Sequence, residues 1–394
     1  MLRFLHTSDW HLGRSFHGRP DALKHRLQQA RLDVLRAIGD LAEQREAAFV
    51  LIAGDVFDAN DADDRTVTQA CAELHRIACP VFIIPGNHDC CDGPASVWRR
   101  ACFNQEQPAH VTLLDTEQPL RLTEFGRPDV VLLPAPLLAR TVTRDTTDHW
   151  TADTGRADTG RADTGQDGTH TPEPLYRIGI AHGGVIDFDF SRDDTAGPDA
   201  AHRTLAPDRA EQAGLDYLAL GDWHSQQPVT ARTWYSGAPE PLRYQERDSG
   251  HTLVVEIDAP GATPRVEAVR TAATRWLNHS AHLTDAADTD ALDAWFTGLD
   301  APTTAMVRLV LSGTLPLPEL NRAEAMLARH GDRLLELRLR GDGLRVTLTD
   351  DDLDALAGDG YLRSAVRQLR AETDGDDDSA SAAREAIRLL SRLG

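Results

Sequence analysis

Short apolar runs alternate with longer stretches of helical periodicity near the start of the chain. Residues 2–7, 49–53 and 81–84 form apolar runs that are typical of buried strands. Between them, residues 21–46 and 65–77 place apolar side chains three and four positions apart, which predicts two helices. The pattern therefore predicts a β-α-β-α-β order, which is typical of α/β folds with a parallel sheet.

Later patterns extend this fold and add a smaller domain. We expect a first domain over residues 1–275, a smaller α/β capping domain over 276–350, and an acidic linker with C-terminal helices over 351–394. Helices are expected at residues 288–299, 319–329, 362–371 and 381–393. Strands are expected at residues 130–133, 176–181, 217–220, 305–311, 334–339 and 344–348, with edge strands at 252–257 and 265–269.

One segment has low sequence complexity. Residues 151–165 repeat Ala-Asp-Thr-Gly with arginine between the copies. A polar, glycine-rich and acidic segment buries too little apolar surface to offset its ordering entropy, so residues 151–170 are expected to form a flexible surface loop. A calcium-binding repeat is the functional alternative, although the repeat lacks an apolar anchor.

Composition limits the class of protein. A hydrophobic content of 41% and a charged content of 26% are ordinary for a globular protein, and no apolar run is long enough to span a membrane. The strand at residues 2–7 leaves no room for a signal peptide, and the five cysteines contain no Cys-x-x-Cys pair. We therefore expect a cytoplasmic protein with reduced thiols. A zinc site made from the cysteines is the alternative.

The net charge of −21 bears on the choice of partner. A strongly acidic chain is not what electrostatics selects for tight, passive binding of nucleic acid. Lys24 is the only lysine, so arginine supplies nearly all the positive charge. Arginine side chains still suit a local groove that contacts phosphate bidentately.

Acidic and histidine motifs follow the apolar runs in a set order. Because parallel strands deliver side chains to one edge of a sheet, we expect these motifs to converge and to hold two divalent metals. The motifs are Asp9-Trp10-His11, Gly54-Asp55, Gly86-Asn87-His88-Asp89, His182 and Gly221-Asp222-Trp223-His224.

Ligand chemistry suggests a role for each early motif. Asp9 and His11 suit one metal, and Asp55 is the candidate for a carboxylate that bridges two. The side-chain oxygen of Asn87 is a hard ligand for a second metal, and His88 is expected to point toward the substrate. We expect Asp89 to accept the other ring N–H of His88. Mixed oxygen and imidazole ligands suit manganese, iron or zinc.

The ordered motifs resemble those of the calcineurin-like metallophosphoesterases. The resemblance covers roughly residues 1–260 and implies an α/β fold class, as an α+β sandwich of two central sheets flanked by helices, with a smaller α/β capping domain. Longer strings look like those of the SbcD-type DNA repair exonucleases: Thr7-Ser8-Asp9-Trp10-His11-Leu12-Gly13-Arg14, Ala53-Gly54-Asp55-Val56-Phe57-Asp58, Ile84-Pro85-Gly86-Asn87-His88-Asp89 and Tyr235-Ser236-Gly237-Ala238-Pro239-Glu240.

The resemblance implies a catalytic role for His88 and a set of ligands for each of two metals. His88 would donate a proton to the leaving oxygen, with Asp89 beside it. The two metals would be held by Asp9, His11, Asp55 and His224, and by Asp55, Asn87, His182 and Asp222.

The chain departs from the family at one ligand. The usual Gly-His-x-His reads Gly-Asp-Trp-His here, with Asp222 in place of the first histidine. A hard anionic ligand favours manganese or magnesium over zinc, so two Mn²⁺ ions are the expected cofactors, with Mg²⁺, Fe²⁺ or Zn²⁺ as alternatives. This variant looks like a branch of stand-alone bacterial phosphoesterases linked to DNA repair. The alternative is that Asp222 disables the enzyme.

These features predict a metal-dependent phosphodiesterase that cleaves DNA as an exonuclease or endonuclease in DNA repair. The resemblance suggests an SbcC-like ATPase or a homodimer as the protein partner. No association with a membrane is expected. The alternatives are a phosphoesterase for nucleotides or other small esters, which the acidic charge favours, and a non-catalytic scaffold. Trp10 and Trp223 suit either base stacking or packing near the metals. The candidate phosphate contacts are Arg14, His17 and Arg243.

Overall fold

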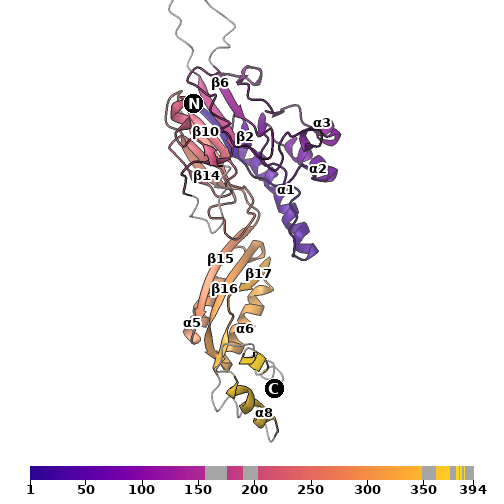
Figure 1. The fold of residues 1–394 in the computed structure, drawn as a ribbon, viewed down its shortest axis with the longest axis vertical. Helices are drawn as coiled ribbons and strands as arrows, with labels where there is room; N and C mark the ends of the chain where they lie inside the picture. Colours follow the sequence, from indigo (N-terminus) through magenta and orange to yellow (C-terminus); the bar gives the residue numbers. More distant parts are fainter. Residues whose placement is uncertain are drawn as a thin grey trace, which may run out of the picture. The chain divides into compact units, whose positions relative to one another are not determined.

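The computed structural model describes residues 1–155, 175–189, 203–347, 361–372, 379–380, 382–383 and 386. The chain divides into two compact units, Met1–Thr274 and Arg275–Gly394 (Figure 1). Among the helices in these described ranges, none combines the length and the apolar character needed to cross a membrane.

The first unit contains a six-stranded sheet that carries the predicted β-α-β-α-β order. Four neighbouring strands, β1 to β4, run parallel to one another. On the other side of β1, β13 and β14 continue the sheet, each antiparallel to its neighbour. β13 lies between β14 and β1, so its prediction as an edge strand was wrong. In spatial order the strands are β14 (Arg265–Arg270), β13 (His251–Ile257), β1 (Leu2–Thr7), β2 (Val50–Ala53), β3 (Val81–Ile84) and β4 (Val111–Leu113).

A second six-stranded sheet has a parallel centre with antiparallel edge strands. The parallel strands are β6, β7, β10 and β12, while β5 and β11 pair antiparallel at the two edges. In spatial order the strands are β11 (Gln227–Pro228), β12 (Thr233–Tyr235), β10 (Tyr217–Gly221), β7 (Tyr176–His182), β6 (Arg127–Ala135) and β5 (Leu120–Leu122). A separate pair is formed by β8 (Gly184–Val185) and β9 (Arg203–Leu205).

The core of the first unit lies between the two sheets and under the helices. Alternation along β1 sends Phe4 into the cluster shared by both sheets, where it packs with Ile178 and Tyr217, and sends Leu5 to the helix side. The two faces explain why these strands are apolar throughout. In the described part of this unit the helices are α1 (Asp21–Gln44), α2 (Asp64–Leu74), α3 (Ala101–Glu106) and α4 (Arg209–Gln212), with short 3-10 turns at Val97–Arg99 and Thr123–Phe125.

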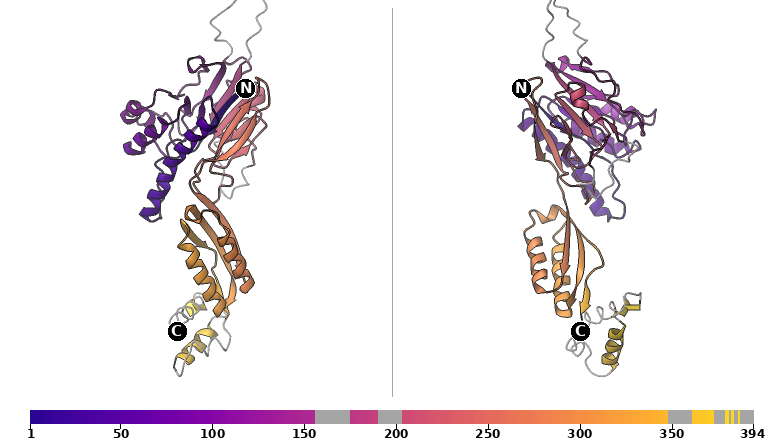
Figure 2. Two further views of the ribbon diagram at one scale, coloured as in Figure 1. Left: turned by 180° about the vertical axis from the view of Figure 1, so that it is seen from behind. Right: turned by 60° about the vertical axis from the view of Figure 1, so that its left-hand side comes forward.

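The second unit is a smaller parallel sheet with two crossover helices. β16 pairs with β15, β17 and β18, always in parallel. Apolar residues of α5 and α6 pack against one face of this sheet, and Figure 2 shows both helices on that side. The elements are β15 (Arg275–Leu283), α5 (Ala286–Thr297), a 3-10 turn (Pro302–Thr304), β16 (Ala305–Pro316), α6 (Leu317–Gly331), β17 (Glu336–Arg340), β18 (Arg345–Thr347) and, further along the chain, α8 (Tyr361–Ala371).

These sheets confirm the predicted fold class, two central sheets with helices and a smaller α/β sheet. The long strands and helices lie where their apolar patterns predicted, but β15 was not predicted. Its core-facing positions include His279 and Ala281, which give a weak apolar signal. Most of the predicted loop over residues 151–170, the linker, and most of the predicted helix over residues 381–393 lie outside the described residues.

Candidate metal centre

The predicted ligands come together at one edge of the two sheets of the first unit. Each follows or ends a strand, and the carboxyl ends of neighbouring parallel strands meet at the same edge. The strand ends supply Asp9 and His11 after β1, Asp55 after β2, Asn87 after β3, His182 at the end of β7, and Asp222 and His224 after β10.

Backbone hydrogen bonds tie the loops that carry these side chains. The Asp9 N–H donates to the Gly54 carbonyl at 3.0 Å, and the His11 N–H donates to the Asp55 carbonyl at 3.0 Å. Across the two sheets, the Asp222 N–H donates to Oδ1 of Asp9 at 3.1 Å. The site therefore depends on both sheets being correctly packed.

Four of these residues have left-handed backbone conformations. The φ angles are 57° at Asp9, 45° at His11, 55° at Asp55 and 94° at Asp222. Residues other than glycine occupy this region at a cost of about 1 kcal/mol or more each, and such strain concentrates at functional sites.

Two glycines give the ligands room. A Cβ added at Gly86 would lie 2.1 Å from Oδ1 of Asp55, and a Cβ at Gly54, where φ is 89°, would lie 2.3 Å from Nδ1 of His182. Neither position tolerates a side chain while these two ligands keep their places.

The first group of donor atoms comprises Asp9, His11 and His224, which each offer one atom within 4.8 Å of the others. Nε2 of His11 is buried and has no hydrogen-bond partner among the described residues. Nδ1 of His224 lies 3.0 Å from Oε1 of Glu246, so its Nε2 is left available for a ligand. A carboxylate that binds the far ring nitrogen in this way fixes the tautomer of a metal-binding histidine.

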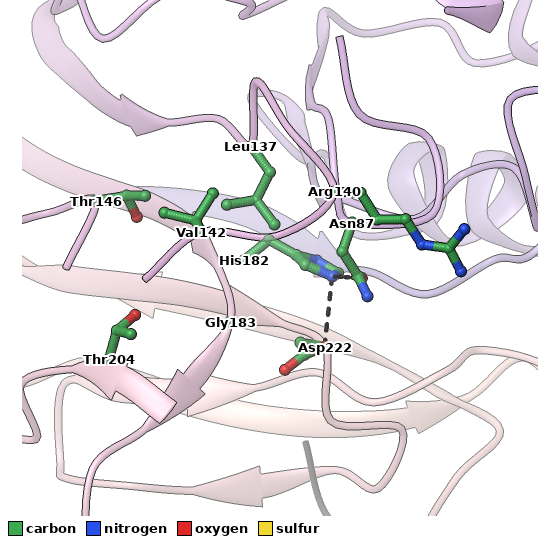
Figure 3. Close-up of a pocket in the computed structure, with 9 residues that line it drawn as sticks. All are labelled: Asn87, Leu137, Arg140, Val142, Thr146, His182, Gly183, Thr204 and Asp222. Carbon is green, nitrogen blue, oxygen red and sulfur yellow. Dashed lines mark hydrogen bonds and ion pairs between the residues drawn. The ribbon is translucent and has the colours of Figure 1, made fainter. Parts of the chain in front are cut away.

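The second group surrounds His182. Its donor atom lies within 4.8 Å of those of Asp9 and Asp55. Nδ1 of His182 lies 2.7 Å from the Ala53 carbonyl and therefore donates to it, while Nε2 lies 3.0 Å from Oδ1 of Asn87 and 3.8 Å from Oδ1 of Asp222 (Figure 3). One ring nitrogen and two side-chain oxygens thus lie close together where a cation would be stabilised.

Asp55 lies between the two groups. Its Oδ2 is 3.7 Å from Nε2 of His11 and 3.5 Å from Nε2 of His182, and its Oδ1 accepts the His88 N–H at 2.9 Å. One carboxylate oxygen therefore faces a ring nitrogen of each group, which is the position that a bridging ligand requires.

The donor set fits divalent metal ions. Besides Nε2 of His11, Oδ2 of Asp222 is buried without a hydrogen-bond partner in the described part of the chain. Buried polar atoms normally have partners, so these two indicate a missing ligand. Oxygen and imidazole donors without thiolate suit hard or borderline cations such as Mn²⁺, Mg²⁺, Fe²⁺ and Zn²⁺.

Charge at the centre also favours a bound cation. Burial raises the pKa of Asp222 to about 6, opposed by His182 and reinforced by the nearby carboxylates of Asp9 and Asp55. Burial lowers the pKa of His11 to about 4, which keeps its ring neutral and able to bind a metal. For His182, burial acts to lower the pKa, but Asp55 and its neighbours raise it well above its usual value.

His88 lies beside the first group but is not oriented by Asp89. Nδ1 of His88 lies 2.6 Å from the carbonyl of Asp58, and the two oxygens of Asp89 accept the N–H groups of Gly86 at 2.7 Å and Phe57 at 3.1 Å. The prediction that Asp89 accepts a ring N–H of His88 was therefore wrong. Asp89 is fully buried and holds together the loops after β2 and β3.

A comparison with protein families identifies the group to which the chain belongs. A family model described as calcineurin-like phosphoesterase matches residues 2–226, which is more than half of the chain. The chain belongs to the calcineurin-like phosphoesterase family. This membership and the His/Asp cluster make it a metal-dependent phosphoesterase, and thus a hydrolase.

Several relatives of this phosphoesterase are nuclease subunits. The SbcD subunit of nuclease SbcCD from Bacillus subtilis (strain 168) is 26% identical over 271 residues, covering 65% of this chain and 66% of that protein. The protein of the same name from Escherichia coli (strain K12) is 34% identical over 91 residues, covering 22% and 21%. That from Rhodobacter capsulatus is 28% identical over 371 residues, covering 86% and 81%. The matches span less than two thirds of the first two relatives, so these names alone establish neither substrate nor partner.

The predicted substrate contacts lie in different surroundings in the phosphoesterase. Arg14 donates to Oδ1 of Asp58 at 3.0 Å, close to His11. His17 is exposed and contacts Ser15 at 2.8 Å. Arg243 is exposed. Although burial acts to lower it, the pKa of His224 is raised by Glu246 and Asp9, and the charge of Arg243 opposes this rise. Arg14 and Arg243 therefore lie near the His11 and His224 side of the site. The side chains of Trp10 and Trp223 are buried, with 1% and 4% exposure, which favours packing over base stacking.

Two residues of the phosphoesterase site were missed from the sequence. Asp58 binds Nδ1 of His11 at 3.1 Å, and Glu246 binds His224. Although burial opposes it, the hydrogen bond to His11 and the charge of Arg14 lower the pKa of Asp58 to about 2. The position of Asp58 three residues after Asp55 was a local signal. The sequence gives no comparable signal for Glu246, which lies 22 residues from His224.

Proposed function

We propose that this chain is a two-metal phosphodiesterase that cleaves DNA, with manganese as its preferred metal. The observation that carries the proposal is the placement of Oδ2 of Asp55 between Nε2 of His11 and Nε2 of His182. One metal would be held by Asp9, His11, Asp55 and His224, and the other by Asp55, Asn87, His182 and Asp222. When bound, such a pair polarises the phosphoryl group and stabilises charge on the attacking and leaving oxygens.

His88 is the proposed proton donor to the leaving oxygen. The Asp58 carbonyl fixes one ring nitrogen by accepting from Nδ1, and the ring stands edge-on to His11 with centroids 4.7 Å apart. Its other nitrogen is therefore the one that would face the reacting ester. General acid catalysis by a positioned histidine contributes roughly 10²- to 10⁴-fold.

The names of the relatives support a nucleic-acid substrate. They are nuclease subunits, and the Rhodobacter capsulatus protein aligns with most of this chain. Action in DNA repair belongs to the same proposal, with an SbcC-like ATPase or a second copy of the chain as the proposed protein partner. The Gly-Asp-Trp-His sequence at residues 221–224 supports activity without the ATPase, as in the branch that it resembles.

The net charge of −21 favours a second candidate, a phosphoesterase for nucleotides or other small esters. Long polyanions are repelled by an acidic surface, while a small ester needs only local complementarity.

The decisive experiment compares two forms of DNA with a small ester. Purified protein is given end-labelled linear and covalently closed circular single-stranded DNA, and a small aryl phosphodiester, with Mn²⁺, Mg²⁺, Zn²⁺ or chelator. Cleavage of the closed circle in Mn²⁺ by the wild type, and not by Asp55→Asn, supports a nuclease that needs no partner. Turnover of the aryl ester with both DNAs intact would instead support the second candidate, a phosphoesterase for small esters.

A further inference from the structure

Among the described residues of the second unit, α5 and α6 cover one face of the sheet, and several side chains on the other face, which we call the open face, are exposed. On the covered face, Val307 and Leu309 pack in the core with residues of α5 and α6, and the ring of His279 stacks on Trp295 with centroids 4.0 Å apart. Side chains alternate along strands, so the neighbouring positions point to the other side. Nδ1 of His282 lies 2.9 Å from Oγ of Ser312, which confirms that β15 and β16 share this open face.

Three arginines gather on the open face. Arg308 of β16 lies opposite Arg338 of β17 in the strand register, and Arg340 follows two positions later on the same side. Arg338 and Arg340 are exposed, and Arg308 is half-buried. No ion pair or hydrogen bond to a carboxylate involves these three side chains among the described residues. We call Arg308, Arg338 and Arg340, with their polar neighbours Asn278, Ser280, His282 and Ser312, the arginine face.

The arginine face contrasts with the rest of the molecule. The four strands of this sheet contain five arginines and one glutamate, in a chain with a net charge of −21. That glutamate, Glu336, lies on β17 two positions before Arg338. On the helices, arginines of α6 pair with acids: Arg329 binds Asp293 at 2.8 Å, and Arg322 binds Asp290. These two arginines of α6 therefore have acid partners, whereas the three arginines of the arginine face have no carboxylate partner among the described residues.

The arrangement of these three arginines favours binding of an anion. Like charges directly opposite each other in a sheet are unfavourable, and Arg308 and Arg338 are opposed in this way without a carboxylate between them. A bound phosphate would remove that repulsion, since the guanidinium group matches phosphate geometry. The groups lie on an exposed sheet surface, which suits an extended polymer better than a small anion. Asn278 and Ser280, both exposed on β15, add hydrogen-bonding groups beside the three arginines.

We propose that the arginine face binds the sugar–phosphate backbone of a nucleic-acid strand. The proposal rests on the nuclease function above and extends it, by giving the second unit a substrate-binding surface. Sheet surfaces bind single strands in several nucleic-acid-binding domains, and positively charged surfaces that follow the backbone supply the electrostatic part of that binding. This surface also accounts for how a strongly acidic chain holds a polyanion, because the cations are concentrated on one face.

The test measures binding of fluorescein-labelled single-stranded DNA to the full chain by anisotropy, with chelator present so that no metal contributes. The double variant Arg338→Gln/Arg340→Gln is compared with Arg322→Gln/Arg329→Gln, which removes the same charge from the helix side. We expect the first variant to weaken binding about tenfold and to reduce the slope of log affinity against log salt by about 1.4, since each single-strand phosphate contact contributes about 0.7. The control variant should bind as the wild type does.

Hydrolysis of the small aryl phosphodiester separates this proposal from the nuclease proposal. Both double variants should retain wild-type turnover of that ester, because none of the four arginines belongs to the metal centre. Equal binding by all three proteins, or equal weakening in both variants, would overturn the arginine face even if the wild type cleaves DNA. Ester turnover with no DNA binding or cleavage by the wild type would overturn both proposals. Binding of polyglutamate in place of DNA would assign the face to an acidic protein partner and overturn the DNA assignment.

Discussion

Glu246 holds the ring of His224 through an Nδ1–Oε1 distance of 3.0 Å, and its second oxygen accepts the Leu242 N–H at 2.8 Å. The carboxylate is itself fixed, so the ring has one orientation, with Nε2 directed away from Glu246. Burial opposes ionisation, but the contact with His224 lowers the pKa of Glu246. This pair extends the metal centre beyond the residues that would contact an ion.

Replacing Glu246 by glutamine should weaken metal binding. An amide cannot stabilise the ring as the carboxylate does, and loss of such partners typically costs roughly 10- to 100-fold in metal affinity. Titration calorimetry with Mn²⁺ measures the change, and Glu43→Gln on the exposed side of α1 is the matched control. Equal Mn²⁺ affinity in both variants would show that Glu246 does not support the site.

Replacing Asp222 by histidine should shift the metal preference. The variant recreates Gly-His-x-His and exchanges a hard anionic oxygen for a neutral nitrogen, which favours Zn²⁺ relative to Mn²⁺. Competition between the two ions, followed by elemental analysis of the dialysed protein, measures the ratio bound. A ratio that stays at the wild-type value would mean that Asp222 does not bind the ion.

Alanine variants of His88 and Asp55 should separate catalysis from metal binding. His88→Ala is expected to keep both metals and to lose roughly 10²- to 10⁴-fold in cleavage rate. Asp55→Ala should lose metals and activity together, because its Oδ2 faces both donor groups. Metal content and cleavage rate are measured on the same preparations, with the exposed His25→Ala as control. Wild-type cleavage by the His88 variant would disprove the proton-donor role.

Buried His6 should make the protein sensitive to acid. Tyr217 Oη lies 2.9 Å from its Nδ1 and the Leu220 carbonyl lies 3.2 Å from its Nε2, and burial lowers the pKa of His6 from 6.5 to about 3. Between these values the unfolded chain binds a proton that the folded protein excludes. The free energy of unfolding is therefore unaffected above pH 6.5 and falls as the pH drops toward 3, by up to about 1.4 kcal/mol per pH unit.

The His6→Gln variant tests this dependence, because glutamine keeps a donor and an acceptor but does not titrate. Urea unfolding of metal-free protein, followed from about pH 7 to about pH 5, should show a shallower loss of stability in the variant than in the wild type. Parallel curves for the two proteins would place the acid sensitivity elsewhere, for example at His11.

The ligands at the strand ends were predictable because parallel topology brings such positions together. Asp9, Asp55 and Asn87 each follow an apolar strand, so the order of motifs contained the geometry. The partner of His88 was not predictable in the same way. The backbone carbonyl of Asp58 contacts the ring, while the carboxylate of Asp89 accepts backbone N–H groups instead, and no side-chain pattern distinguishes these two outcomes.

Contacts between loops that are distant in the chain could not be predicted from the sequence. Glu246 reaches His224 from a segment without strand or helix, and neither periodicity nor spacing connects the two. The register that places Arg308 beside Arg338 was equally hidden, because it depends on how β16 and β17 align across α6. Long-range pairing thus carried the information that local patterns lacked.

Stability and activity make opposite demands at the four ligands with positive φ angles, which are Asp9, His11, Asp55 and Asp222. Glycine at any of these four positions would relieve an unfavourable backbone conformation while removing a donor atom. Selection for survival at high temperature without metal would enrich such glycines, and selection for turnover would eliminate them. The working enzyme is therefore a compromise in which the fold gives up part of its own stability to keep four side chains aimed at one place.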